Sequence, residues 1–116
     1  MKNFECQILI KSQDSKDSFK VVVHDDIEKG VLSYEEDNTI TTYDYKNDIF
    51  TRENDDMKIK YHFCLNKITE NKILIKNINS EVTINVLTKQ IEKNKDYIKI
   101  IYEIEDNKFT YMIKRR

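Results

Sequence analysis

The stretch that decides the fold is MKIKYHF, residues 57–63, in which apolar and polar side chains alternate. A period of two places the two sets of side chains on opposite faces of an extended strand. The same period occurs in FECQILIK at 4–11, VTINVL at 82–87 and YIKIIYEI at 97–104. Because the pattern recurs near both ends and in the middle, the chain is predicted to be all-β.

Shorter segments with strand character lie between these four stretches. We predict them at 19–23, 31–35, 39–45, 49–53, 72–77 and 109–113, with polar turns at 13–18, 25–30, 36–38, 46–48, 54–56 and 66–71. Parallel strands need a crossover of about a dozen residues or more, and no link here is that long. The sheet should therefore be an antiparallel meander, and the strand spacing suits a sandwich or an up-and-down barrel. Of the two, we expect an antiparallel up-and-down barrel of about 8–10 strands, forming a single domain over residues 1–116. Residues 88–95 fit a strand end with a turn or one helical turn equally well.

Glycine is almost absent, which makes the bends of such a barrel unusual. The chain has one glycine, Gly30, and no proline. Asparagine tolerates positive φ better than other non-glycine residues. We therefore expect asparagine to make the bends, at Asn38, Asn47, Asn54, Asn66, Asn71, Asn79, Asn94 and Asn107.

Composition and charge restrict the possible partners. Charged residues make up 35% of the chain, yet the formal net charge is only −1, so no field favours a nucleic acid. The N-terminal residues lack the pattern of a signal peptide, and no run approaches ~18 apolar residues. We expect a cytoplasmic protein that binds neither nucleic acid nor membrane. Its two cysteines, Cys6 and Cys64, are expected to be reduced, buried thiols.

No catalytic or metal-binding motif is present. His24 and His62 lie on the polar faces of their strands and are expected to be exposed or hydrogen-bonded, since a metal site needs three or four converging ligands. A single glycine leaves no nucleophile-elbow pattern, and adjacent carboxylates such as Asp25-Asp26 point to opposite faces of a strand or lie in turns. We therefore expect no catalytic residue, no metal and no cofactor.

The more informative residues are the strand tyrosines and Arg52, the only arginine outside the C-terminal tail. An inward-facing set of tyrosines with an arginine would suit a polar or amphipathic ligand, because a small barrel is filled by side chains or keeps room for one ligand. The candidate lumen residues are Tyr34, Glu36, Arg52, Tyr61, Thr88 and Tyr102. In the alternative, the tyrosines lie half-buried with their hydroxyls in water and Arg52 forms a structural ion pair.

Three segments resemble an uncharacterised family. GVLSYEE at 30–36 resembles a Ser-Tyr-Glu-Glu stretch of the YwiB-like, calycin-type barrel proteins of Gram-positive bacteria. REN at 52–54 with MKIKYHF at 57–63, and VTINVLT at 82–88 with IKIIYEI at 98–104, are similar to further strands of that family. The family's members are longer and carry glycines where this chain has Asn79-Ser80. The resemblance implies a lipocalin-like barrel and no established activity.

These patterns lead to three functional hypotheses of different classes. The leading one is a non-catalytic barrel that binds a small apolar or amphipathic molecule. The second is a protein-interaction or dimerisation module, which requires a gap in the barrel or a large apolar outer patch. The third is an enzyme, which requires a strongly perturbed acid or base in a cleft. The chain is expected to be a monomer or a homodimer.

Overall fold

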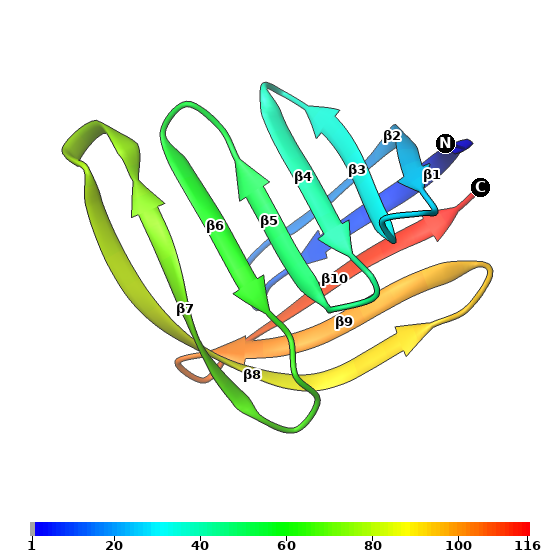
Figure 1. Ribbon diagram of the computed structural model, residues 1–116. Coiled ribbons are helices and arrows are strands. Elements are labelled where there is room, and N and C mark those ends of the chain that lie inside the picture. The colour runs from blue at the N-terminus through cyan, green and yellow to red at the C-terminus, as the bar shows by residue number, and fades with distance from the viewer. Residues whose placement is uncertain (1) are drawn as a thin grey trace.

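A computed structural model describes residues 2–116, and over this range ten antiparallel strands close into a barrel (Figure 1). The strands are β1 (Lys2–Lys11), β2 (Lys16–Asp26), β3 (Val31–Glu36), β4 (Thr39–Asp44), β5 (Ile49–Glu53), β6 (Met57–His62), β7 (Ile68–Ile75), β8 (Ser80–Lys93), β9 (Tyr97–Ile104) and β10 (Asn107–Arg115). Each strand pairs with its neighbours in sequence, and β1 also pairs with β10. The predicted all-β antiparallel barrel is confirmed.

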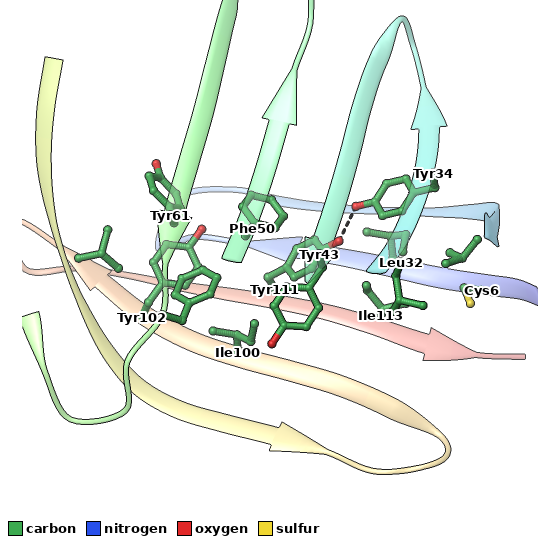
Figure 2. Close-up of a cluster of buried hydrophobic side chains, with 14 residues drawn as sticks. Cys6, Leu32, Tyr34, Tyr43, Phe50, Tyr61, Ile100, Tyr102, Tyr111 and Ile113 are labelled. Carbon is green, nitrogen blue, oxygen red and sulfur yellow. Dashed lines mark hydrogen bonds between the residues drawn. The ribbon is translucent and has the colours of Figure 1, made fainter. Parts of the chain in front are cut away.

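Along each strand, alternate side chains point into the lumen of the barrel and out to its surface. The core is lumenal, and its most deeply buried members come from five strands and from the segment that follows β6: Ile8, Val23, Tyr43, Phe63, Val86, Thr88 and Ile100. Figure 2 shows the buried aromatic rings crowded together between the strands. Branched and aromatic residues suit both the pleated strand and this interior, which explains why one sequence pattern specifies both.

Two tight turns confirm that residues other than glycine make the bends. Asp37 and Asn38 both have positive φ between the paired residues Glu36 and Thr39. Glu105 and Asp106 also have positive φ, between β9 and β10. Two-residue hairpins with positive φ at both positions match the right-handed twist of the flanking strands. Aspartate and glutamate therefore share the role that the sequence assigned to asparagine.

The other asparagines act in different ways. Asn66 and Asn79 do adopt positive φ. Asn54 and Asn94 instead accept two backbone N–H bonds each through their side-chain oxygens, at 2.9–3.0 Å, which is the Asx-turn arrangement. Gly30 has a φ of 71°, and an added Cβ would lie 2.5 Å from the side chain of Lys46. Glycine is thus required both by the backbone and by the side chain packed over it.

The prediction of a turn at 66–71 is wrong beyond its first two residues, because β7 begins at Ile68. The polar sequence of this segment did not show the alternation expected of a strand, because the inner-face position 71 is occupied by asparagine rather than by an apolar residue. Asn71 is buried, and its side-chain oxygen accepts the His62 N–H at 2.8 Å. Its amide nitrogen donates to the Thr69 carbonyl at 3.0 Å. The Asn71 side chain therefore bridges β6 and β7 beyond the point where their main-chain register ends at Lys60 and Lys72.

Replacing Asn71 by alanine should destabilise the barrel by about 1–3 kcal/mol, because the His62 N–H would lose its acceptor. Urea unfolding followed by circular dichroism measures this change. Asn85→Ala is the matched control, since Asn85 lies on the exposed face of β8 and its loss should change stability by less than about 0.5 kcal/mol. Equal effects of the two substitutions would contradict the bridging role of Asn71.

Residues 88–93 form a strand end and residues 94–95 lie in the turn that follows it, so the alternative of a helical turn is wrong. β8 continues to Lys93, with a register shift between Thr88 and Gln90 in its pairing with β9. A β-bulge of this kind bends the strand and increases its twist. The long, bent β8 sweeps beneath β6 and β7 and ends in the hairpin with β9 (Figure 1). The helical content of residues 2–116 is one turn at Lys76–Ile78, and no helix there could cross a bilayer.

The barrel wall is incomplete between β2 and β3. Their pairing covers only His24–Asp26 with Val31–Ser33, although β2 extends back to Lys16. From Lys16 to Val23 the edge of β2 that faces β3 has no partner strand among the described residues. The ring of Phe19 packs edge-on against Tyr34 across this split, with 6.2 Å between centroids. Side chains therefore close the wall where main-chain hydrogen bonds stop.

Candidate functional site

A cavity of about 300 Å³ opens at one end of the barrel, which we call the terminal cavity. This end carries the start of β1, the end of β10 and the β8–β9 hairpin, all on the right of Figure 1. Six inward-facing residues form an apolar floor and wall: Phe4, Cys6, Val23, Leu32, Ile98 and Ile113. A ligand pocket typically occupies 300–1,000 Å³ and is mostly apolar, so this cavity falls at the small end of that range.

Polar residues surround the mouth of the terminal cavity. They are Asp25, Tyr45, Lys93, Asn94, Lys95, Asp96, Tyr97 and Arg115. Asp25 accepts a hydrogen bond from the Tyr45 hydroxyl at 3.1 Å. Lys93 forms an ion pair with Asp48 at 2.6 Å and donates to the Tyr45 carbonyl at 2.8 Å. Several of these groups are thus held in place by the protein, which gives the mouth a fixed polar rim above an apolar floor.

Arg115 forms part of the rim directly above the floor. It is paired with Cys6 across the β1–β10 ladder, and its guanidinium carbon lies 3.6 Å from the centroid of the Phe4 ring. Stacking over an aromatic face is typical of arginine. Burial raises the pKa of the Cys6 thiol, and the positive charge of Arg115 offsets part of that rise. The thiol therefore stays protonated at neutral pH and adds to the apolar floor.

None of the six candidate lumen residues lines the terminal cavity. All six nevertheless lie on the inner-facing register of their strands. Tyr34, Tyr61, Thr88 and Tyr102 are buried, while Glu36 and Arg52 are half-buried. Glu36 and Arg52 lie next to the β3–β4 and β5–β6 turns, at the end of the barrel opposite the terminal cavity. We call this the Arg52 end. Their role in ligand binding stays a prediction.

Two of the six residues have hydroxyls that already bond within the protein. The Tyr34 and Tyr111 hydroxyls are hydrogen-bonded to each other at 2.6 Å, as the dashed line in Figure 2 shows. The Thr88 hydroxyl accepts the Cys64 N–H at 3.2 Å. Thr88 thus supports the chain between β6 and β7, a structural role that its place in the sequence did not suggest.

Arg52 is not held by an ion pair. Among residues 2–116 the salt bridges involve lysines only. In the ladders on either side, Arg52 is opposite Thr41 and Ile59. Burial raises the pKa of Tyr34, Tyr102 and Tyr111, and the charge of Arg52 offsets part of that rise at each hydroxyl.

The histidines and cysteines lie apart from one another. His24 is exposed on β2, where its Nδ1 is hydrogen-bonded to Asn3 at 2.7 Å, and His62 is exposed on β6. Both match the expectation of exposed or hydrogen-bonded histidines. Cys6 is buried and Cys64 half-buried, and both are free thiols. Within the described residues no cluster of three histidine, cysteine or acidic side chains could hold a metal ion.

Sequence reasoning missed the residues of the terminal cavity. Phe4 and Cys6 lie in the alternating stretch 4–11 and Val23 lies in the predicted strand 19–23. Nothing in an alternating pattern distinguishes a wall that lines a pocket from one that is packed. A weak signal was present in the charged and aromatic residues that gather near the β8–β9 turn, from Lys93 to Tyr97. The sequence alone does not show that these residues lie near β1 and β10, because that proximity arises only when the barrel closes.

Comparison with known proteins supports the fold. No family model matches the chain, and no curated protein matches it. The solved structures include one similar chain, described as the crystal structure of ywiB protein from Bacillus subtilis. The two chains are 17% identical in sequence. The structural match covers 98% of this chain and 90% of the ywiB chain, with a TM-score of 0.59. At this identity the similarity concerns the fold alone: the chain has a barrel fold similar to that of the ywiB protein.

Proposed function

We propose that this protein is a non-catalytic cytoplasmic barrel that binds a small apolar or amphipathic molecule in the terminal cavity. The observation that supports the proposal is the cavity of about 300 Å³ with an apolar floor and a polar rim. That volume corresponds to about ten water molecules at liquid density. An apolar group on the floor would be removed from water, and a polar head would remain at the rim.

The rim favours a ligand with a polar or charged head over a wholly apolar one. Three of its residues are cationic, Lys93, Lys95 and Arg115, and two are anionic, Asp25 and Asp96. Lys93 already pairs with Asp48, so Lys95 and Arg115 are the cations best placed to meet a ligand. A fluorescent probe with a fused aromatic body and a sulfonate, anilinonaphthalene sulfonate, matches this arrangement.

Titration with anilinonaphthalene sulfonate tests the proposal. We expect saturable binding at one site, and Val23→Phe should weaken it at least about tenfold, because the larger ring occupies the floor. Val22→Phe is the matched control, since Val22 is the next residue on β2, faces outward and is 46% exposed. It should bind the probe as the unsubstituted protein does.

Overpacking can itself cost about 1–3 kcal/mol, so both variants are first checked for cooperative unfolding. If Val23→Phe does not fold, Ile98→Phe replaces it, because Ile98 lines the same cavity and is half-buried. Two results would count against the proposal: no saturable binding by the unsubstituted protein, or equal affinity in the floor variant and the Val22→Phe control.

The split between β2 and β3 favours a second candidate function, homodimerisation. An edge without a partner strand can pair with a strand of another copy, and the free edge runs from Lys16 to Val23. Lys16 and Lys20 are exposed on this edge, and charged edge residues oppose such pairing, so this candidate ranks second. Light scattering over a concentration series distinguishes the two states. If the protein dimerises through this edge, we expect a dimer at the higher concentrations. A monomer at every concentration would contradict homodimerisation.

A further inference from the structure

The last part of β8 is attached to the barrel along one edge only. Its pairing with β7 ends at Leu87, and the loop after β6 bonds to the main chain of Thr88. From Gln90 to Lys93 the strand pairs with β9 alone among the described residues. Figure 1 shows this part of β8 running on toward the hairpin. The β8–β9 hairpin is therefore joined to the barrel wall through β9 and β10, and its other edge faces no strand within residues 2–116.

One side chain bridges the edge that the strands leave open. The ammonium of Lys93 forms the ion pair with Asp48 at 2.6 Å and donates to the Tyr45 carbonyl at 2.8 Å. Asp48 and Tyr45 lie between β4 and β5, and neither of these strands is a neighbour of β8 in the barrel. Lys93 and Tyr45 both line the terminal cavity, so this link joins two sides of its mouth.

The Asp48 carboxylate is itself held by the protein, since it accepts a hydrogen bond from the Tyr43 hydroxyl. The Lys93 ammonium lies 5.9 Å from the centroid of the same Tyr43 ring, within the range of a cation–π contact. The side chains of Lys93 and Asp48 are 34% and 24% exposed, against 66% and 57% for the Lys72–Glu81 pair. Solvent screens a shielded pair less than an exposed one, so the Lys93–Asp48 contact is the stronger of the two.

A point at which β8 can bend lies at the other end of this segment. The register of β8 against β9 shifts between Thr88 and Gln90, and such a bulge interrupts the ladder locally. On the far side of the hairpin, the Arg115 N–H donates to the Asp96 carbonyl at 2.8 Å. If Lys93 were released, the hairpin would stay attached on that side alone and could bend away from the β4–β5 turn.

We propose that the β8–β9 hairpin, residues 90–97, is a lid on the terminal cavity and that the Lys93 contact with Asp48 and Tyr45 holds it closed. The proposal rests on the proposed function, because a lid matters only to a cavity that takes a ligand. Residues 93–97 all line the cavity, so outward movement of the hairpin widens its mouth. A lid of this kind controls how fast a ligand enters and leaves.

Hydrogen–deuterium exchange without ligand is the first test, and it uses two variants. Lys93→Met keeps most of the side-chain length and removes the ammonium. Asp48→Asn removes the partner's charge, keeps an acceptor for the Tyr43 hydroxyl and suits the positive φ at this position. In each variant the amides of residues 90–97 should exchange about tenfold faster, the effect of losing one hydrogen bond to a charged group. The amides of β1 and β6 should exchange as in the unsubstituted protein.

Stopped-flow binding of anilinonaphthalene sulfonate is the second test. Both variants should raise the association and the dissociation rate constants together, with a smaller change in the dissociation constant. Lys93→Met removes a positive charge and Asp48→Asn removes a negative one, so a purely electrostatic effect on this anionic probe would have opposite signs. Asp48 does not line the cavity, so a shared rise in both rate constants reports on the lid rather than on contacts with the probe.

Lys72→Met is the matched control. It removes an ion pair made to β8, the 3.4 Å contact with Glu81, on the part of that strand nearer the Arg52 end. It should change neither the exchange of residues 90–97 nor the rate constants of the probe. The double variant of Lys93 and Asp48 should resemble either single variant, because the two residues act through one contact.

Three outcomes would overturn the proposal. One is hairpin exchange in both variants that equals that of the unsubstituted protein, and another is exchange that accelerates equally throughout the barrel. The third is a pair of variants whose rate constants are unchanged or move in opposite directions. If the unsubstituted protein does not bind the probe, the proposed function fails, whereas the exchange experiment still decides whether Lys93 holds the hairpin.

Discussion

Raising the pH above about 10 is expected to unfold the protein in one steep transition. Five tyrosines, Tyr34, Tyr43, Tyr61, Tyr102 and Tyr111, are buried in the lumen, and burial raises the pKa of each hydroxyl above its usual value of 10.0. At Tyr43 the hydrogen bond to Asp48 adds to the rise. These hydroxyls therefore stay protonated in the folded state when they would ionise in the unfolded state.

The sign of the effect follows from this difference. Below pH 10 both states hold the same protons, and the full stability is present. Above pH 10 the unfolded state loses protons that the folded state keeps, so stability falls as pH rises toward the folded-state pKa. A tyrosine whose folded-state pKa stays well above the solution pH costs about 1.4 kcal/mol per pH unit above 10, so several such tyrosines together cost several kcal/mol. That is comparable to the whole stability of a small domain, about 5–15 kcal/mol.

Circular dichroism and tyrosinate absorbance, measured on the same samples, check this prediction. The loss of strand signal and the ionisation of the five lumenal tyrosines should occur together. A barrel that keeps its strand signal while all seven tyrosines titrate near pH 10 would contradict the lumenal burial of the hydroxyls.

Replacing Phe63 by alanine should destabilise the barrel by about 3–5 kcal/mol, the usual cost of removing a buried phenyl ring. Phe63 is 2% exposed, and its ring lies 5.0 Å from that of Tyr102 and 6.2 Å from those of Phe50 and Tyr61, measured between centroids. Its removal would leave a void among aromatic rings that the strands hold in place. Urea unfolding measures the change in the free energy of unfolding.

Ile68→Ala serves as the matched control for that substitution. Ile68 is close in sequence but 68% exposed on β7, so its truncation should change stability by less than about 0.5 kcal/mol. If Phe63→Ala cost no more than Ile68→Ala, the aromatic cluster would not be the centre of the core.

The fold could be predicted from the sequence because alternation carries two kinds of information at once. Ile59, Tyr61 and Phe63 identify a strand and also the face that points inward. The sequence left open whether Arg52 faces inward, and the pairing of β5 with β4 and β6 shows that it does. The start of β7 could not be found in this way, since Asn71 occupies an inner position and works through hydrogen bonds rather than through apolar burial.

The candidate site was less accessible to sequence reasoning. The six residues chosen for their chemistry do face inward, but the open cavity is lined by other residues, at the end of the barrel that carries the β8–β9 hairpin. Its floor joins β1, β2, β3, β9 and β10 through residues such as Cys6 and Ile98, whose types are ordinary for a strand. Whether such residues pack together or leave space depends on the strand splay at a barrel end, a property of the closed sheet that no single segment encodes.

The structure thus separates two features that the sequence had combined in one lumen. The terminal cavity offers volume and an apolar floor. The candidate lumen residues lie elsewhere on the inner face, where Tyr34 is hydrogen-bonded to Tyr111 and the rings of Tyr61 and Tyr102 pack together.

The most direct test of the central claim is to locate the bound probe by nuclear magnetic resonance. With anilinonaphthalene sulfonate added to saturation, we predict nuclear Overhauser effects from the probe's aromatic protons to the methyl groups of Val23, Leu32, Ile98 and Ile113, which line the terminal cavity. Contacts to the exposed methyl groups of Val22, Ile40 or Ile68 instead, or no contact with any methyl group, would contradict a binding function for this cavity.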